Sequence, residues 1–230
     1  MLTLAIQMSQ INRGPLEEEI LKGRIKLISF DAEGTLVTPD FSHTVWHEAI
    51  PVFYAQRNGV ELAQAKRIVA TEYDKIGDQR HEWYDINFWF RHLHLGVPEP
   101  VIQSCQDKVS YYPEVIDVLS SLDGQYRLII ASGTPLELLH YLLRDIEPYF
   151  AHVFSSTSHY KQLKTPDFYL QVCREMDVKP SQVVHVGDNW QFDFLNPKQV
   201  GIHAFYLDRT GNDHRDSLTD LSQLKYCLLA

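Results

Sequence analysis

The stretch Ile25-Lys26-Leu27-Ile28-Ser29-Phe30-Asp31-Ala32-Glu33-Gly34-Thr35-Leu36 decides the fold that this sequence predicts. Its first half is a short apolar run, rich in branched and aromatic side chains, which is typical of a buried parallel strand rather than a helix. Asp31 follows at the carboxyl end of this strand, where open α/β sheets bind their ligands, and Gly34 allows a sharp turn. Taken alone, an aspartate followed three residues later by a glycine also fits an ordinary type I turn. Later stretches of the chain decide between a ligand site and a turn.

Three later stretches favour the ligand site. They are Leu128–Ala131 running into Ser132-Gly133-Thr134, then Lys164-Thr165-Pro166 opening a helical pattern, and Val183–Val186 running into Gly187-Asp188, with Asp193 five residues on. In this order and at this spacing, the four stretches resemble the four sequence motifs of the haloacid dehalogenase superfamily of phosphohydrolases. The resemblance extends from about Ile25 to Arg209. The four motifs together are far more specific for this superfamily than any one of them alone.

The composition favours a globular protein that binds neither nucleic acid nor membranes. Hydrophobic residues make up 44% of the 230 residues, which is enough for a sizeable core. The net charge of −9 argues against the basic surface that displaces counterions from nucleic acid. No run approaches the roughly 20 apolar residues of a membrane-spanning helix. The apolar start Met1–Ile6 lacks the basic residues of a secretory signal.

The cysteines indicate the compartment. Cys105, Cys173 and Cys227 lie far apart, without the spacing of a zinc site or a disulfide framework. A reducing compartment fits this pattern best, so we expect a cytoplasmic protein. The oligomeric state is left open by the sequence.

Strand and helix patterns alternate on both sides of a helical insert. Residues 1–24 form an extension in which Pro15–Gly23 has the proline start and glycine end of a short helix. From 39 to 100, apolar residues follow helical spacing without strand-like alternation, which predicts three or four helices. From 101 to 230 the alternation of strands and helices predicts a doubly wound parallel sheet. The fold class is therefore α/β, with a Rossmann-like core from 25–38 and 101–230 and a small all-helical domain at 39–100.

Individual elements of the core follow from the same patterns. We expect helix ends at Asn58-Gly59 and Gly96-Val97-Pro98, and either an edge helix or an edge strand after Asp208. The expected strands are near 126–131, 152–155, 183–186 and 202–207, and the expected helices are at 112–119, 135–143, 166–176 and from about 192.

The resemblance implies a role for the helical insert. An insert between the first and second motifs corresponds to the superfamily's helical (C1-type) cap, which covers the active site and selects the substrate. We expect Arg91 to read a second anionic group of the substrate, although the same pattern fits a cap core with arginines on a solvated face. The cluster that could face the pocket consists of Arg80, His81, Trp83, Tyr84, Asn87 and Arg91.

The resemblance also implies a nucleophile and a metal site. Asp31 corresponds to the aspartate that attacks phosphorus to give an aspartyl-phosphate. Asp188 would bind Mg²⁺ together with Asp31 and the backbone carbonyl of Glu33, and Asp193 would bind it directly or through a water. Hard oxygen ligands of this kind are what Mg²⁺ prefers. The expected cofactor is therefore Mg²⁺.

The remaining motif residues would bind and protonate the substrate. The Ser132 hydroxyl and the Gly133 amide would hydrogen-bond to phosphoryl oxygens. Lys164 would neutralise the phosphoryl group, with Lys161 as the competing candidate. Glu33 departs from the superfamily pattern, in which an aspartate serves as general acid and then base. Glutamate keeps the carboxyl chemistry but moves it by about 1 Å, a displacement that can cost about 10²-fold in rate.

The expected function is hydrolysis of a small phosphorylated metabolite, with three alternatives. The first is a 2-haloacid dehalogenase, because Asp31-Ala32-x-Gly34-Thr35 also resembles that branch. Four carboxylates facing one lysine would repel a haloalkanoate anion by several kcal/mol in a low-dielectric site, whereas Mg²⁺ would make a phosphomonoester tolerable. The second alternative is a weakly active binding protein, with Glu33 marking lost acid function. The third is a phosphotransferase.

Overall fold

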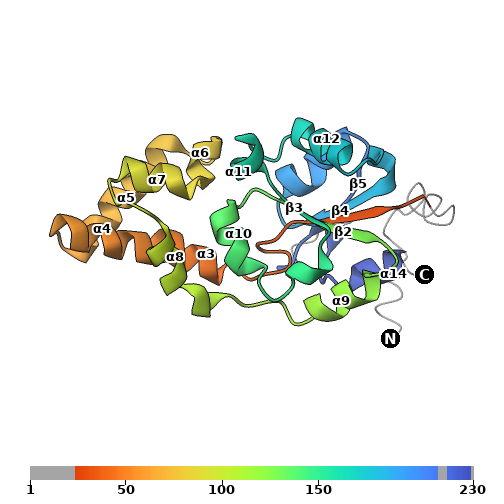
Figure 1. The fold of residues 1–230 in the computed structure, drawn as a ribbon, viewed down its shortest axis with the longest axis horizontal. Helices are drawn as coiled ribbons and strands as arrows, with labels where there is room; N and C mark the ends of the chain where they lie inside the picture. The colour runs from red at the N-terminus through yellow and green to blue at the C-terminus, as the bar shows by residue number, and fades with distance from the viewer. Residues whose placement is uncertain (1–23, 212–216, 229–230) are drawn as a thin grey trace.

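The computed structural model describes residues 24–211 and 217–228 of the chain. The predicted helix at Pro15–Gly23 lies outside the described residues. Figure 1 shows two lobes, one built around a sheet and the other entirely of helices. None of the helices in the described ranges is both long and apolar enough to cross a membrane.

The sheet confirms the predicted α/β fold class. In the described part of the chain it has six parallel strands in the order β3-β2-β1-β4-β5-β6. The central strand β1 lies between β2 and β4, so the second and fourth motifs end beside the first. The bounds are β1 Leu27–Phe30, β2 Arg127–Ser132, β3 His152–Ser155, β4 Val183–Gly187, β5 His203–Leu207 and β6 Ser217–Leu218.

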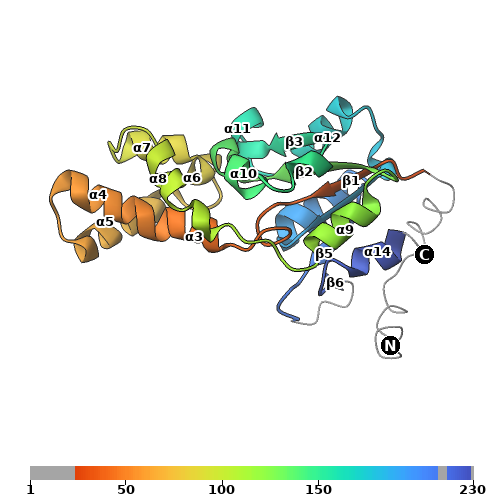
Figure 2. The same cartoon turned by 60° about the horizontal axis from the view of Figure 1, so that its bottom comes forward.

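Helices cover both faces of this sheet (Figures 1 and 2). Packing on two faces explains why the strands read as continuous apolar runs rather than as an alternation. The α-helices of this lobe are α9 Val115–Leu122, α10 Leu136–Leu142, α11 Ser156–Tyr160, α12 Pro166–Glu175, α13 Asn196–Gln199 and α14 Gln223–Leu228. Shorter turns are η2 Gln106–Lys108, η3 Glu147–Tyr149 and η4 Pro180–Gln182, and η5 Trp190–Leu195 is π-helical.

Two details of this lobe differ from the prediction. The helix expected from about Phe192 begins at Trp190, because the Asn189 side chain caps it by accepting a hydrogen bond from the Phe192 N–H. The tail holds both an edge strand and a helix, β6 and α14, where the sequence predicted one or the other. Figure 2 shows these two elements beside the sheet.

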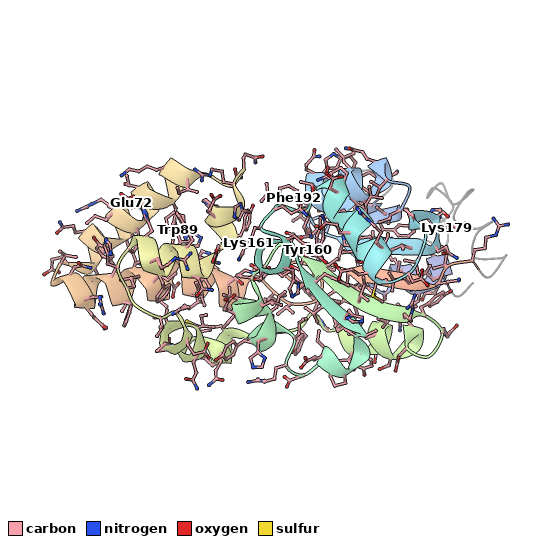
Figure 3. All side chains as sticks on the ribbon, turned by 45° about the horizontal axis from the view of Figure 1, so that its top comes forward. Glu72, Trp89, Tyr160, Lys161, Lys179 and Phe192 are labelled. Carbon is pink, nitrogen blue, oxygen red and sulfur yellow. The ribbon has the colours of Figure 1, made fainter. Side chains whose placement is uncertain are left out.

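The second lobe is all-helical between residues 40 and 104. Its first three elements, α3 Asp40–Thr44, η1 Val45–Ala49 and α4 Ile50–Asn58, follow one another without a break. Gly59 ends α4 in the left-handed conformation, as the Asn-Gly pair predicted. Trp89 is buried inside this lobe, whereas Glu72 lies on its outer side (Figure 3). The remaining helices are α5 Leu62–Ile76, α6 His81–Tyr84, α7 Ile86–His92 and α8 Glu99–Ser104.

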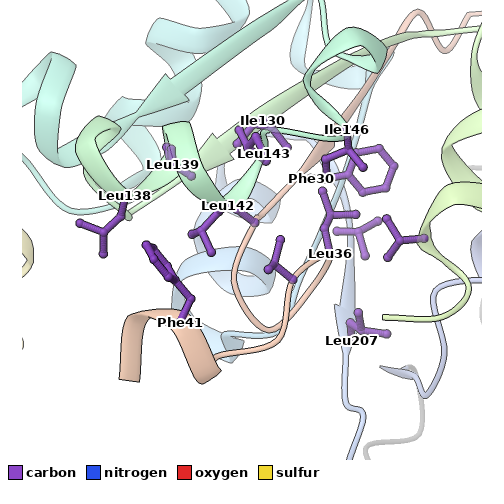
Figure 4. Packing of buried hydrophobic residues seen from close by; sticks show 14 of the residues in the cluster. Phe30, Leu36, Phe41, Ile130, Leu138, Leu139, Leu142, Leu143, Ile146 and Leu207 are labelled. Carbon is purple, nitrogen blue, oxygen red and sulfur yellow. The ribbon is translucent and has the colours of Figure 1, made fainter. Parts of the chain in front are cut away.

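Successive side chains of β1 point into two different apolar clusters, and this packing fixes the position of the strand ends. Ile28 and Phe30 face one apolar cluster, which includes α9, α10 and α14, and Leu27 faces another, which includes α12. In Figure 4, Phe30 packs beside Ile146, and Phe41 of α3 lies next to the α10 leucines. The first cluster therefore continues from the sheet into the helical lobe and fixes where that lobe begins.

Candidate active site

Three polar residues of the motifs meet at the carboxyl edge of the sheet. Asp31 follows β1, Ser132 is the last residue of β2, and Asp188 follows β4. The Asp31 N–H donates to the Val186 carbonyl at 2.9 Å, which ties the end of β1 to β4. Carboxyl ends of adjacent parallel strands share one edge, so this convergence follows from the strand order.

Two glycines allow carboxylates to approach the backbone closely. Gly34 has a φ of +76°, and an added Cβ there would overlap the carboxyl group of Asp188. An added Cβ at Gly187 would overlap the side chain of Asp193. Any larger residue at either position would therefore displace a carboxylate of the site.

Lys164 is the cation of the site. It lies just before α12, where the Thr165 side chain caps the helix by accepting a hydrogen bond from the Phe168 N–H. Its side chain is 5% exposed, and Nζ donates to Asp31 Oδ1 at 2.8 Å and forms an ion pair with Asp193. Between the two candidate lysines, the structure brings Lys164 rather than Lys161 to the carboxylates.

Lys161 lies on the surface near the helical lobe. Its side chain is 61% exposed, and its Nζ lies 4.0 Å from Asp85 Oδ2. Figure 3 shows it where the two lobes meet, together with Phe192. This position is consistent with Lys161 contacting the helical lobe rather than the carboxylates.

The surrounding groups shift the pKa values of the buried carboxyl groups in different directions. Burial raises the pKa of Asp31, an effect that Lys164 opposes. Burial also disfavours charge on Asp193, but Lys164 and His185 outweigh it and lower the pKa to about 2. The two acids in turn raise the pKa of Lys164 despite its burial. Asp31, Asp193 and Lys164 therefore form a buried, interacting group in which one lysine stabilises negative charge on two acids whose burial opposes it.

Asp188 is the most open of the three aspartates. Although the residue is exposed to solvent, desolvation of its carboxyl group by the surrounding protein and the negative charges of Asp31 and Asp193 raise its pKa to about 8. A cation near this carboxylate would counteract the repulsion by its neighbours.

Glu33 is half-buried and lines the same cavity as Asp31. Desolvation raises the pKa of Glu33 to about 7; the Ser42 hydroxyl opposes this rise, and the charge of Asp31 adds to it. A carboxyl group with this pKa is present in both protonation states near neutral pH.

Ser132 and Gly133 lie beside the aspartates. Ser132 is buried, its hydroxyl accepts from the Thr134 N–H at 3.2 Å, and its hydrogen bond to Asp31 lowers the pKa of that carboxyl. The Gly133 carbonyl accepts from the Thr157 hydroxyl at 2.7 Å, which fixes this turn. Both residues line the cavity over Asp31.

A buried polar network behind Asp193 was not assigned to the site from the sequence. His185 is fully buried, with Nε2 at 3.0 Å from Asp193 Oδ1 and Nδ1 at 2.9 Å from the Ser29 hydroxyl. Tyr169 donates to the Phe192 carbonyl at 2.7 Å and lies against His185. These groups fix the orientation of Asp193 from behind.

The strand ends open into a cavity of about 380 Å³ that the helical lobe also lines. The predicted cluster of that lobe divides: Trp83 and Tyr84 line the cavity, whereas Asn87 bonds to Glu137 of α10. Arg91 is exposed on α7 and is not among the lining residues, because Trp89 and Phe90 occupy the buried face of that helix. The lining residues that sequence reasoning missed include Ser42, His43, Trp46, His47, Ser156 and Asn189.

The aspartates fit a divalent cation. Asp31, Asp188 and Asp193 each offer a carboxylate oxygen, and these oxygens lie within 4.8 Å of one another. The missing Cβ at Gly34 leaves room for the Asp188 carboxyl group. Oxygen ligands with negative charge are those that Mg²⁺ prefers, so this donor set suits that ion.

The fold and this arrangement of aspartates and lysine define a class of hydrolases. A family model described as haloacid dehalogenase-like hydrolase matches residues 25–201. The chain therefore belongs to the haloacid dehalogenase-like hydrolase family, as its motifs predicted.

Individual relatives span most of the chain. It is 25% identical over 222 residues to the glyceraldehyde 3-phosphate phosphatase of Pyrococcus furiosus, covering 87% of this chain and 92% of that protein. The crystal structure of a HAD phosphatase from Thermococcus onnurineus matches with a TM-score of 0.78 and 24% identity, over 89% of this chain and 98% of that one. A 2-haloacid dehalogenase from Pseudomonas syringae matches with a TM-score of 0.66 and 21% identity, over the same two shares. The two structural matches show a shared fold.

Proposed function

We propose that this hydrolase is a Mg²⁺-dependent phosphatase that removes phosphate from a small phosphorylated metabolite through an aspartyl-phosphate on Asp31. The observation that carries the proposal is the group of three converging carboxylates with one buried lysine bound to two of them. The name of the Pyrococcus relative, a phosphatase of a small phosphoester, supports the same reaction class.

Asp31 is the proposed nucleophile. Lys164 holds its Oδ1 at 2.8 Å and, by its charge, favours the ionised form that attack requires. Attack on phosphorus forms a bond between the carboxylate oxygen and phosphorus while the bond to the ester oxygen breaks. Ser132 and the Gly133 amide lie beside Asp31, where they would bind phosphoryl oxygens.

The charge of the site supports the proposed requirement for a metal ion. When all three are ionised, Asp31, Asp188 and Asp193 exceed Lys164 by two negative charges, which would repel a phosphate ester. Mg²⁺, when held by these three carboxylates and the backbone carbonyl of Glu33, supplies the positive charge that lets the phosphoryl group approach Asp31.

Glu33 is the proposed proton donor and acceptor. It lines the cavity beside Asp31, where it could give a proton to the leaving alcohol oxygen and then take one from the water that attacks the aspartyl-phosphate. The added methylene of glutamate places this carboxyl group farther from its backbone than an aspartate would. We infer that the cavity is built for this longer side chain.

The helical lobe corresponds to the proposed cap of residues 39–100 over a catalytic core of 25–38 and 101–230, although its last helix, α8, continues to Ser104. Its α6 and α3–η1 segments line the cavity above Asp31, so closure over a substrate would exclude water from the first step. Three cysteines without disulfide bonds are consistent with the proposed cytoplasmic location.

The proposal is tested by phosphate release from an aryl phosphate and from a panel of small phosphoesters, with Mg²⁺ and with a chelator. Turnover should require Mg²⁺ and should be lost in Asp31→Asn. The matched control is Asp107→Asn, which changes an aspartate with a 70% exposed side chain outside the cavity and should keep full activity. Chloride release from a 2-chloroacid without metal, in the absence of phosphate release, would instead identify a dehalogenase.

A further inference from the structure

The cavity has two chemically different halves. The half at the sheet edge carries the carboxylates and Lys164, whereas the half formed by the helical lobe is lined by aromatic and imidazole side chains. We call this second set the aromatic wall. Because the phosphoryl group must lie at the sheet edge, the alcohol part of the ester lies against the aromatic wall. It comprises His43, Trp46 and His47 from α3 and η1, and Trp83 and Tyr84 from α6.

The aromatic wall offers no permanent positive charge. Among the described residues that line the cavity, Lys164 is the one lysine or arginine, and two carboxylates already bind it. Near α6, the exposed Arg80 forms an ion pair with Glu82 and is not among the residues that line the cavity. Burial and the neighbouring His43 imidazole lower the pKa of His47, which disfavours positive charge on that ring. An anionic group on the alcohol would therefore meet the carboxylates without a compensating cation.

One buried pair of side chains fixes both segments of the wall. The Tyr73 hydroxyl donates to the Trp46 carbonyl at 3.1 Å, and Trp89 Nε1 donates to the Trp83 carbonyl at 2.9 Å. The Tyr73 and Trp89 rings pack edge to face with centroids 4.6 Å apart. Because each ring holds one segment and the rings contact each other, the wall is preorganised.

The chemistry of the wall suits an uncharged, hydroxylated group. Flat faces of Trp46 and Trp83 provide apolar contact, and imidazole nitrogens donate to or accept from hydroxyl and carbonyl groups. Ser156 lines the same cavity, and its buried hydroxyl has no hydrogen-bond partner within the described ranges. A hydroxyl or carbonyl group on the substrate would satisfy it.

We propose that the aromatic wall selects phosphoesters of uncharged hydroxyl- or carbonyl-bearing alcohols, as in small sugar and polyol phosphates, over esters whose alcohol carries a carboxylate or a second phosphate. This inference rests on the proposed phosphatase function. The residues that would determine substrate specificity are His43, Trp46, His47, Trp83 and Tyr84. Tyr73 and Trp89 would hold these residues in position.

The first test compares glycerol 3-phosphate with 3-phosphoglycerate, which differ by a hydroxymethyl group against a carboxylate. At about pH 8, above the ordinary imidazole pKa, kcat/KM should be at least about tenfold higher for glycerol 3-phosphate. Equal values, or a preference for the carboxylate, would overturn the inference. An aryl phosphate is assayed with the same protein as a control. If it is hydrolysed but the two glycerol-based esters are not distinguished, the inference on selectivity fails while the phosphatase proposal stands. If no ester is hydrolysed, the phosphatase proposal and the inference on selectivity both fail.

The second test adds a cation to the wall. His47→Arg should reduce the preference for glycerol 3-phosphate over 3-phosphoglycerate by about tenfold or more. Gln56→Arg adds the same charge on the exposed side of α4, outside the cavity, and should leave the ratio unchanged. An unchanged ratio in folded His47→Arg, or an equal change in Gln56→Arg, would contradict the inference. The ratio of the parent protein decides the matter even if His47→Arg does not fold.

Discussion

Gly34 lies so close to Asp188 that a single added carbon at residue 34 would overlap the Asp188 carboxyl group. The contact joins the loop after β1 to the end of β4, and with it the proposed nucleophile to a proposed metal ligand. The backbone of Gly34 also has a φ of +76°, which non-glycine residues rarely adopt. Two independent constraints therefore require glycine at this position.

Gly34→Ala should displace Asp188 and abolish the response to Mg²⁺. Gly59→Ala is the matched control, because Gly59 also has a positive φ of +64° but an added Cβ there meets nothing within 4 Å. Both variants should lose about 1–2 kcal/mol of stability from backbone strain. Calorimetric titration with Mg²⁺ should show binding in Gly59→Ala and none in Gly34→Ala. Equal Mg²⁺ affinity in the two variants would show that the approach to Asp188 is unimportant.

Lys164→Met should both inactivate and destabilise the protein. Removing the ammonium group leaves Asp31 and Asp193 buried without their cation, which should cost about 3–5 kcal/mol in urea unfolding measured without metal. Lys161→Met removes the same charge from an exposed position and should change stability by less than about 0.5 kcal/mol. A small loss at Lys164 similar to that at Lys161 would be incompatible with a buried ion-pair network.

Glu33→Gln should slow the hydrolysis of esters with poor leaving groups more than the hydrolysis of esters with activated leaving groups. An aryl phosphate needs little protonation of its leaving oxygen, whereas an alkyl phosphate depends on it, so the alkyl ester should lose about 10²–10⁴-fold in kcat. Equal losses for the two esters would argue against proton transfer by Glu33.

Glu33→Asp distinguishes an intact site from a decayed one. If the cavity is built for glutamate, shortening the side chain by about 1 Å should reduce turnover by up to about 10²-fold. A large rise in turnover would instead show that Glu33 marks lost function. Circular dichroism of Glu33→Gln and Glu33→Asp checks that both variants are folded.

Mg²⁺ should stabilise the folded protein through the three aspartates. At a concentration of 100 times its dissociation constant, binding adds about 2.7 kcal/mol, which corresponds to roughly 5–10 °C in Tm for a chain of this size. Asp188→Asn should remove most of this shift, and Asp107→Asn should keep it. A full Mg²⁺ shift in Asp188→Asn would place the ion elsewhere.

The sheet and its polar edge were predictable because they depend on local signals. Strand β1 is a buried apolar run that ends at an aspartate, and β4 ends the same way, so their adjacency brings Asp31 and Asp188 together. Thr165 and Pro166 marked the start of α12 and thereby placed the backbone of Lys164. These features need only chain-local patterns and the topology that such patterns imply.

The aromatic wall was harder to predict, because helical spacing does not say which face of a helix meets a cavity. Val45 packs into the core while Trp46 and His47 line the cavity, although all three lie in one π-helical turn. Arg91 shows the converse: its charge suggested a ligand contact, but its direction on α7 was set by the burial of Trp89. These orientations arise from how the helices pack against one another in three dimensions.

The network behind Asp193 was missed for a related reason. His185 is a single polar residue among the valines of β4, and nothing nearby in the sequence indicates its partner Ser29, which lies 156 residues away on β1. The parallel register pairs these two residues directly. Only the pairing of the strands reveals the contact.

Central to the proposed function is that Asp31 carries the phosphoryl group during turnover. The most direct measurement is acid quenching of the reaction of Glu33→Gln with a phosphoester and Mg²⁺, followed by mass spectrometry of the peptides. We predict a phosphate adduct on the peptide that contains Asp31, and no adduct after the additional change Asp31→Asn. Phosphate release that persists in Asp31→Asn, or an adduct on another residue, would contradict the account.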